Sequence, residues 1–246
     1  MNASTPMTMS DEFLSRQRLL VVSPHADDES FGCAGTMARI KRCGGEVYVL
    51  VMTVGDLKHY DGQPDIVSGS VRAAEFDAVA KFLGIDGYDI AYTDAHTHLR
   101  LDAVPQRDLI EIIERKSSVS LDRIQPTMVA LPAISYNQDH VATFHAGFTA
   151  CRPHDPTVKG FPKIVVGYDN QTLFWNVDYD KFHPNFYVDI SDYLEIKLQA
   201  LQLHKSQVRN APHPCSLENM EYLAKTRGHH IAVTAAEAFV CHRFVI

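Results

Sequence analysis

Short apolar runs alternate with segments of helical periodicity through the first 150 residues, and this alternation constrains the fold more than any other feature. The apolar runs span 19–23, 47–54, 88–92 and 127–131, and helical patterns follow at 37–40, at 70–83, at 105–116 and from Asp139. Strands that read as continuous apolar runs, separated by helices, are typical of a parallel sheet covered on both faces. We therefore predict an α/β fold, a Rossmann-like three-layer sandwich with a mainly parallel sheet.

The pattern is less regular in the last third of the chain. Apolar runs at 163–166, 186–190 and 238–240 and helical segments at 191–204 and 217–227 can be recognised there. Ser191 is predicted to be a helix N-cap, because its hydroxyl can accept a hydrogen bond from a free amide of the first turn. Since no repeat and no linker composition interrupts the chain, residues 1–246 are predicted to form one domain, with 1–16 as a flexible extension.

Charge and cysteine content exclude several classes of protein. The formal net charge of −7 disfavours nucleic acid and anionic membrane surfaces as partners, because both are bound through clusters of Lys and Arg. The five cysteines form no C-x-x-C pair, which favours reduced thiols. No segment approaches the roughly 18 apolar residues of a membrane span. We therefore expect a cytoplasmic protein without a membrane span, and homo-oligomerisation stays open.

Histidine and carboxylate side chains follow two of the predicted strands. Residues 24–29 read Pro-His-Ala-Asp-Asp-Glu after the first strand, and 136–140 read Tyr-Asn-Gln-Asp-His after the fourth. The carboxyl ends of parallel strands meet at one edge of the sheet, where ligands bind. His25 and Asp28 are three residues apart and can face one ion from a tight turn, and His140 is the candidate third ligand. Imidazole nitrogen with carboxylate oxygen suits zinc.

Three protein ligands leave a coordination position for water, which is the arrangement of a catalytic zinc site. Asp27 is then a free carboxylate beside the ion and could take a proton from the metal-bound water. The competing interpretation is that the Asp27-Asp28 pair only caps a helix and that His140 is an ordinary core or surface residue. Two complementary motifs at matching strand ends favour the metal site.

These motifs resemble the PIG-L/LmbE family of zinc-dependent N-deacetylases, whose hallmarks are P-H-x-D-D-E after the first strand and a later D-H. Further segments that resemble the family are Gly32–Thr36, Arg72–Glu75, Leu83-Gly84, Val188–Ile190 before Lys197, His204–Gln207, Arg227-Gly228 and Ala236–Phe239, within residues 17–244. The resemblance implies a Rossmann-like sandwich that removes acetyl from an N-acetylated amino sugar. It places one zinc per chain on His25, Asp28 and His140. It makes Asp27 the general base.

One position departs from the family pattern. Many members have a histidine three residues before the zinc histidine, to help the tetrahedral intermediate or protonate the leaving amine, and this chain has Asn137 there. An amide can donate a hydrogen bond to an oxyanion but cannot act as an acid. His204 is the candidate replacement, although a histidine at a helix C-terminus is also favoured by the helix dipole alone. Asp139 is expected to orient a neighbour rather than to bind the metal.

Two more residues are candidate substrate contacts. Arg72 stands at the start of the second helix near the same sheet edge, where it could grip a charged or hydroxyl-rich group, although it could equally be a helix-surface arginine. Asp94 follows the third strand and could contact substrate from its loop. His96 and His98 alternate in the same loop, and we prefer the Asp94 assignment to a second metal site on these histidines. The glycines of 32–35 do not form a nucleotide-binding fingerprint and are expected to permit close helix packing.

The sequence therefore predicts a zinc-dependent hydrolase that removes an N-acetyl group from an amino-sugar-containing small molecule or glycoconjugate. Two alternatives stay open. One is a non-catalytic carbohydrate-binding or regulatory protein that retains the metal pocket, and the other is a zinc amidohydrolase acting on a non-sugar amide. Specificity is expected to depend on loops 56–69, 93–104 and 152–185. Aromatic residues of these loops that could stack on sugar rings are Tyr60, Trp175, Tyr179 and Phe182.

Overall fold

A computed structural model describes residues 8–58, 66–155, 157, 159–170 and 182–246. Its strands form a seven-stranded sheet in the order β3-β2-β1-β4-β5-β7-β6. They are β1 (Arg18–Ser23), β2 (Glu46–Thr53), β3 (Gly87–Tyr92), β4 (Met128–Pro132), β5 (Ile164–Tyr168), β6 (Phe186–Asp189) and β7 (Ala236–Phe244). The strands β1 to β5 pair in parallel, and β7 lies antiparallel between β5 and β6. The prediction of a mainly parallel sheet is confirmed.

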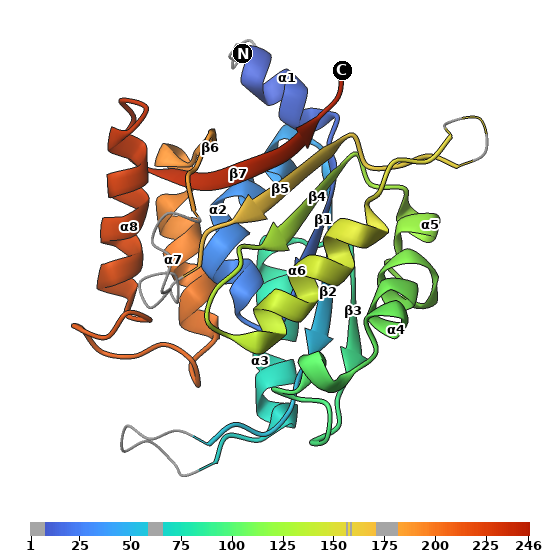
Figure 1. The fold of residues 1–246 in the computed structure, drawn as a ribbon. Helices are drawn as coiled ribbons and strands as arrows, with labels where there is room; N and C mark the ends of the chain where they lie inside the picture. The colour runs from blue at the N-terminus through green and yellow to red at the C-terminus, as the bar shows by residue number, and fades with distance from the viewer. Residues whose placement is uncertain (1–7, 59–65, 156, 158, 171–181) are drawn as a thin grey trace.

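Helices cover both faces of the sheet (Figure 1). They are α1 (Met9–Ser15), α2 (Asp28–Cys43), α3 (Gly69–Leu83), α4 (Gln106–Glu111), α5 (Leu121–Ile124), α6 (Gln138–Ala150), α7 (Leu194–Leu203) and α8 (Leu217–His229). A π-helical turn (Ile112–Lys116) extends α4, and two 3-10 turns occupy Leu101–Ala103 and Ser191–Tyr193. The helices α2, α3 and α7 lie on one side and α4, α5 and α6 on the other, as the three-layer prediction requires.

The central strand β1 shows how the sequence produces these layers. Successive side chains of a strand point to opposite faces. Leu19 and Val21 accordingly belong to the apolar cluster under α2 and α3, whereas Leu20 and Val22 belong to the cluster under α4 and α6. Because both faces are buried, the strand reads as an uninterrupted apolar run and ends at Ser23. The chain turns there into α2, at the edge of the sheet where β4 and β5 also end.

Two glycines of α2 allow this helix to approach its neighbours. A Cβ atom on Gly32 would lie 2.3 Å from Cδ2 of Tyr168 in β5. A Cβ atom on Gly35 would lie 2.8 Å from the side chain of Ile190. Both distances are too short for real contacts, so these glycines serve close packing, as predicted.

The predicted flexible extension over 1–16 is wrong for residues 9–15, which form α1. The side chain of Thr8 accepts a hydrogen bond from the amide of Asp11 and caps the helix. Arg39 of α2 pairs with Asp11 at 2.8 Å, and Leu14 is buried in the core. A hydrophobic contact and an ion pair to a distant helix hold this short segment, and neither can be recognised from local composition. Residues 1–7 lie outside the described residues.

The predicted N-cap at Ser191 is also wrong. A 3-10 turn over Ser191–Tyr193 precedes α7, and Tyr193 occupies the N-cap position without a capping side chain. The amide and the hydroxyl of Ser191 both donate to Oδ1 of Asp189, at 2.9 and 2.6 Å. The serine therefore belongs to the turn that follows β6.

Within the described part of the chain, no helix has the length and apolar character needed to cross a bilayer.

Candidate functional site

The three predicted metal ligands meet at the carboxyl edge of the sheet. His25 follows β1, Asp28 is the first residue of α2, and His140 lies in the first turn of α6. All three are buried, and one ligand atom from each lies within 4.8 Å of the others. Oδ2 of Asp28 is 3.3 Å from Nδ1 of His25 and 3.3 Å from Nε2 of His140. Two imidazole nitrogens and a carboxylate oxygen therefore converge in a group that could hold a divalent metal.

Hydrogen bonds of the Ser23 hydroxyl stabilise the turn that carries His25. The Ser23 hydroxyl donates to the carbonyl oxygen of His25 at 2.6 Å and accepts a hydrogen bond from the amide of Glu29 at 3.2 Å. The amide of His25 donates in turn to Oδ2 of Asp28. The last residue of β1 thus joins the strand to the first turn of α2 and brings the two ligands together.

Two residues support the histidines from outside the cluster. Nε2 of His25 donates to Oδ2 of the fully buried Asp139 at 3.0 Å, which leaves Nδ1 facing Asp28. Asp139 orients a neighbour, as predicted. Nδ1 of His140 lies 3.4 Å from the side-chain amide of Asn170, just after β5. Such outer partners set the tautomer and the ring orientation of metal-binding histidines, so the arrangement fits a metal on the inner nitrogens.

The charges of the cluster shift the pKa values of its members in opposite directions. Burial alone would raise the pKa of Asp28, but the charge and the hydrogen bonds of His140 and His25 hold it well below its usual range. Burial would lower the pKa of His25, yet its bonds to Asp139 and Asp28 raise it to about 9. Without a metal, the carboxylates therefore retain a proton on this imidazole.

Asp27 is buried next to this group and is free of the structural role that the competing interpretation assigned to it. It occupies the N-cap position of α2, but its side chain makes no capping hydrogen bond. Burial and the neighbouring charge of Asp28 raise its pKa, whereas the positive charge of Arg72 lowers it. A carboxylate with a raised pKa beside a group that could hold a metal is suited to accepting a proton.

Arg72 is a buried residue, 2% exposed, and not a helix-surface arginine. Its Nη1 donates to Nε2 of His98 at 3.0 Å, and Nδ1 of His98 is 3.3 Å from the hydroxyl of Thr53. Burial and then the charge of Arg72 lower the pKa of His98 to about 4, so this imidazole is neutral. The ring of His98 contacts the ring of His25, at 5.7 Å between centroids. Arg72 and His98 therefore lie next to the group of His25, Asp28 and His140.

His96 is exposed whereas His98 is buried, and among the described residues neither belongs to the group that could hold a metal. Asp94 is also exposed, and its Oδ1 accepts the amides of His96 and Thr97 at 3.0 Å each. This carboxylate organises the turn after β3. Its contact with substrate stays a prediction.

The two candidates for the missing histidine occupy different environments. Asn137 is half-buried at the start of α6, where its Oδ1 accepts the amide of Asp139 at 2.9 Å and caps the helix. His204 is completely buried, and its Nε2 contacts Oε1 of Glu29 at 3.0 Å. Burial would lower the pKa of His204, but this bond raises it. The structure thus leaves Asn137 partly exposed three residues before His140 and buries His204 against Glu29.

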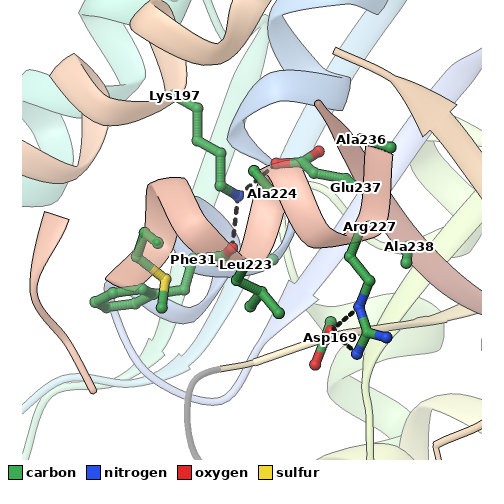
Figure 2. Close-up of a pocket in the computed structure, with 11 residues that line it drawn as sticks. Phe31, Asp169, Lys197, Leu223, Ala224, Arg227, Ala236, Glu237 and Ala238 are labelled. Carbon is green, nitrogen blue, oxygen red and sulfur yellow. Dashed lines mark hydrogen bonds and ion pairs between the residues drawn. The ribbon is translucent and has the colours of Figure 1, made fainter. Parts of the chain in front are cut away.

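Sequence reasoning missed the interactions that tie the C-terminal elements to this edge (Figure 2). Lys197 of α7 and Glu237 of β7 form a buried ion pair at 2.5 Å. Nζ of Lys197 also donates to the carbonyl of Phe31 at 2.6 Å, and Glu237 accepts the amides of Gly35 and Thr36. The pair therefore bridges the backbone of α2, which carries Asp28. The only local signal was that both residues stood in segments that resembled the family.

A second ion pair lies near the first, and both line one small pocket (Figure 2). Arg227 of α8 donates through Nε and Nη2 to Oδ2 of Asp169, at 3.0 and 2.7 Å (Figure 2). Asp169 precedes Asn170, so this bond anchors the segment that reaches His140. The guanidinium of Arg227 also lies 5.5 Å from the ring centroid of Phe182, one of the aromatic residues that could stack on sugar rings. Tyr60, Trp175 and Tyr179 lie outside the described residues.

Sequence comparisons show which known proteins this chain is similar to. The model of the family described as "PIG-L: GlcNAc-PI de-N-acetylase" matches residues 20–151. Diacetylchitobiose deacetylase of Thermococcus kodakarensis is 26% identical over 216 residues, which cover 81% of this chain and 73% of that protein.

Solved structures share the fold across nearly the whole chain. N,N'-diacetylchitobiose deacetylase of Pyrococcus horikoshii superimposes with a TM-score of 0.67 at 22% identity, covering 98% of this chain and 95% of that one. The 4-carboxy-2-hydroxymuconate hydratase of Pseudomonas putida KT2440 superimposes with a TM-score of 0.72 at 17% identity, covering 94% and 98%. These two proteins carry different chemistries on one fold, so the fold alone does not determine the reaction.

Proposed function

The chain belongs to the GlcNAc-PI de-N-acetylase (PIG-L) family, and from this premise we propose that it is a zinc-dependent hydrolase that removes the N-acetyl group from an amino-sugar-containing small molecule or glycoconjugate. The observation that carries the proposal is the buried group of His25, Asp28 and His140 with the free carboxylate of Asp27 beside it. Relatives whose names describe the removal of acetyl from chitobiose or glucosaminyl malate support an amino-sugar substrate.

In this proposal three protein ligands bind one metal ion per chain. Nδ1 of His25, Nε2 of His140 and a carboxylate oxygen of Asp28 are the three donors, and zinc suits them. Zinc, when bound there, supplies a Lewis acid for the acetamide carbonyl and makes a water more acidic. Asp139 keeps the proton of His25 on Nε2 and so leaves Nδ1 free for the metal.

The remaining residues handle the proton and the developing charge. Asp27 accepts the proton of the attacking water, because its buried carboxylate has a raised pKa and makes no capping bond. It then returns the proton to the departing amine. Nδ2 of Asn137 donates to the oxyanion, because Oδ1 of this side chain is engaged by the α6 amide. Arg72 binds a polar substituent of the sugar.

An acetate-release assay tests this proposal by comparing zinc-loaded protein with chelator-treated protein. The substrate panel contains N-acetylglucosamine, N,N'-diacetylchitobiose, glucosaminyl conjugates and non-sugar acetamides. Acetate released from the sugars only by the loaded protein is the expected result. Saturable sugar binding without acetate would establish the non-catalytic alternative, and release from non-sugar amides alone would establish the other amidohydrolase.

Two variants separate the roles within the site. Asp27→Asn is expected to retain the metal and to lower kcat by about 10²- to 10⁴-fold, the range for loss of a general base. His140→Ala is expected to lose the metal itself, measured by elemental analysis. Asp102→Asn changes an exposed carboxylate in the 3-10 turn after β3 and serves as the control. A fully active Asp27→Asn protein would exclude the assigned base.

A further inference from the structure

We propose that His98 is a positioning residue for substrate recognition, which holds the guanidinium of Arg72 so that its remaining N–H groups bind an oxygen substituent of the amino sugar. This inference rests on the function proposed above and goes beyond it, because His98 is neither a metal ligand nor a proton carrier in that reaction. The contact that carries it is the 3.0 Å bond between Nη1 of Arg72 and Nε2 of His98, two buried side chains.

The chemistry of the two groups determines the direction of this bond. A guanidinium has only donors, so Nε2 of His98 must present its lone pair. The ring proton then lies on Nδ1, which donates to the hydroxyl of Thr53 at 3.3 Å. Because the lone pair of Nε2 is engaged by Arg72, His98 does not offer it to a metal, although its ring touches that of His25.

The backbone around His98 is shaped for this placement. A Cβ atom on Gly55, just after β2, would lie 2.5 Å from Cβ of His98. A Cβ atom on Gly69, at the start of α3, would lie 2.9 Å from Cα of Gly55. Leu99 adopts a φ of 59°, a conformation that an L-residue with a branched side chain rarely takes. Two glycines and a strained residue thus bring His98 against Arg72.

The bond leaves Arg72 with unused donors. Nε of Arg72 is buried and has no hydrogen-bond partner. Among the described residues, the guanidinium of Arg72 bonds to His98 and forms no ion pair, although its charge lowers the pKa of Asp27. A buried cation with a spare donor and no carboxylate in direct contact is costly to maintain, which favours a role in binding. Its partner is a hydroxyl or anionic oxygen of the sugar near the acetamido group.

The test compares His98→Leu, which removes both ring nitrogens, with His98→Gln. A glutamine can accept from Arg72 through its oxygen and donate to Thr53 through its nitrogen. We expect His98→Leu to lower kcat/KM for the best acetylated sugar of the panel about 10- to 100-fold, mainly through KM, as for loss of a hydrogen bond to a charged group. His98→Gln is expected to recover most of this loss. Metal content is expected to stay unchanged in both.

A double-mutant cycle separates positioning from general stability. If His98 acts through Arg72, then His98→Leu has little further effect on KM in an Arg72→Ala background. Additive effects, or a loss confined to kcat and metal content, would overturn the proposal. His96→Leu, an exposed histidine in the same loop, is the matched control and should leave KM unchanged.

Failure of the proposed function can be told from failure of this inference. If the wild-type protein releases no acetate, the proposed function is wrong. The double-mutant cycle is then repeated with dissociation constants for N-acetylglucosamine and N,N'-diacetylchitobiose, measured by calorimetry, in place of KM. Binding that His98→Leu weakens and His98→Gln restores would still support the positioning role. Unchanged binding in His98→Leu, or no sugar binding by the wild-type protein, would overturn it.

Discussion

Asp139 accepts a hydrogen bond from Nε2 of His25 on one oxygen, at 3.0 Å, and from the backbone amide of Leu101 on the other, at 2.9 Å. One buried carboxylate thus joins the segment after β3, the start of α6 and the histidine that follows β1. The bond to Leu101 prevents the carboxylate from turning away. The orientation of His25 is therefore set by residues from two other elements.

Asp139→Asn tests the consequence for metal binding. An amide is a weaker acceptor than a carboxylate and carries no charge, so His25 becomes a less basic and less ordered ligand. Metal affinity is expected to fall about 10- to 100-fold, as is typical for outer partners of metal-binding histidines. A competition titration with a chromogenic chelator measures this change. Affinity equal to that of the Asp102→Asn control would contradict the assignment.

Asn137 carries two roles that substitution can separate. Asn137→Ala removes the cap of α6 and the Nδ2 donor, whereas Asn137→Ser keeps an oxygen for the amide of Asp139. Both variants are expected to lower kcat, about 10²-fold or more if the amide donates to an oxyanion. Only Asn137→Ala is expected to lose stability, by about 1 kcal/mol. Steady-state kinetics and denaturant unfolding distinguish the two effects, and normal turnover in Asn137→Ser would exclude the oxyanion role.

Lys197 is predicted to matter for folding through its buried pair with Glu237. Lys197→Met leaves the charge of Glu237 without its partner, and the expected loss in free energy of unfolding is about 3–5 kcal/mol. Adding Glu237→Gln is expected to restore part of the loss, because the amide carries no charge and can still accept a backbone hydrogen bond from α2.

The control for this experiment is Lys225→Met in α8, whose ion pair with Glu221 is far more exposed. Its effect on the free energy of unfolding is expected to stay within about 1 kcal/mol. Urea unfolding measures both proteins. A comparable loss in the two variants would show that the burial of the Lys197 pair is unimportant.

Asp11 in the N-terminal helix is expected to make the free energy of unfolding depend on pH in the acidic range. Hydrogen bonds from Thr8 and Arg39 lower the pKa of Asp11 from 3.8 to about 2. The folded state therefore binds this proton less readily than the unfolded state, and the contribution of Asp11 is fully present above pH 3.8. It declines as the pH falls toward about 2. Asp11→Asn is expected to flatten the melting temperature against pH in that window, and an unchanged slope would contradict the prediction.

Local sequence determined the architecture of the N-terminal part because its signals are short-range. A continuous apolar run predicts a strand that is buried on both faces, as in a parallel sheet between helices. The runs at β1, β2 and β4 form such strands. The spacing of His25 and Asp28 at the end of β1 likewise predicted that they could share an ion. The antiparallel placement of β7 between β5 and β6 depends on pairing across the whole C-terminal region, and no local pattern indicates it.

Tertiary structure alone decided what the other candidate residues do, because their partners are remote in sequence. His204 is buried and its Nε2 contacts Glu29, 175 positions away. Arg72 is buried rather than exposed because the loop after β3 folds His98 onto it. The sequence by itself predicted the parallel part of the sheet, and it proposed His25, Asp28 and His140 as metal ligands with Asp27 as a free carboxylate. The environment of each group, on which its proton and its hydrogen bonds depend, was set by contacts between segments that only the folded chain brings together.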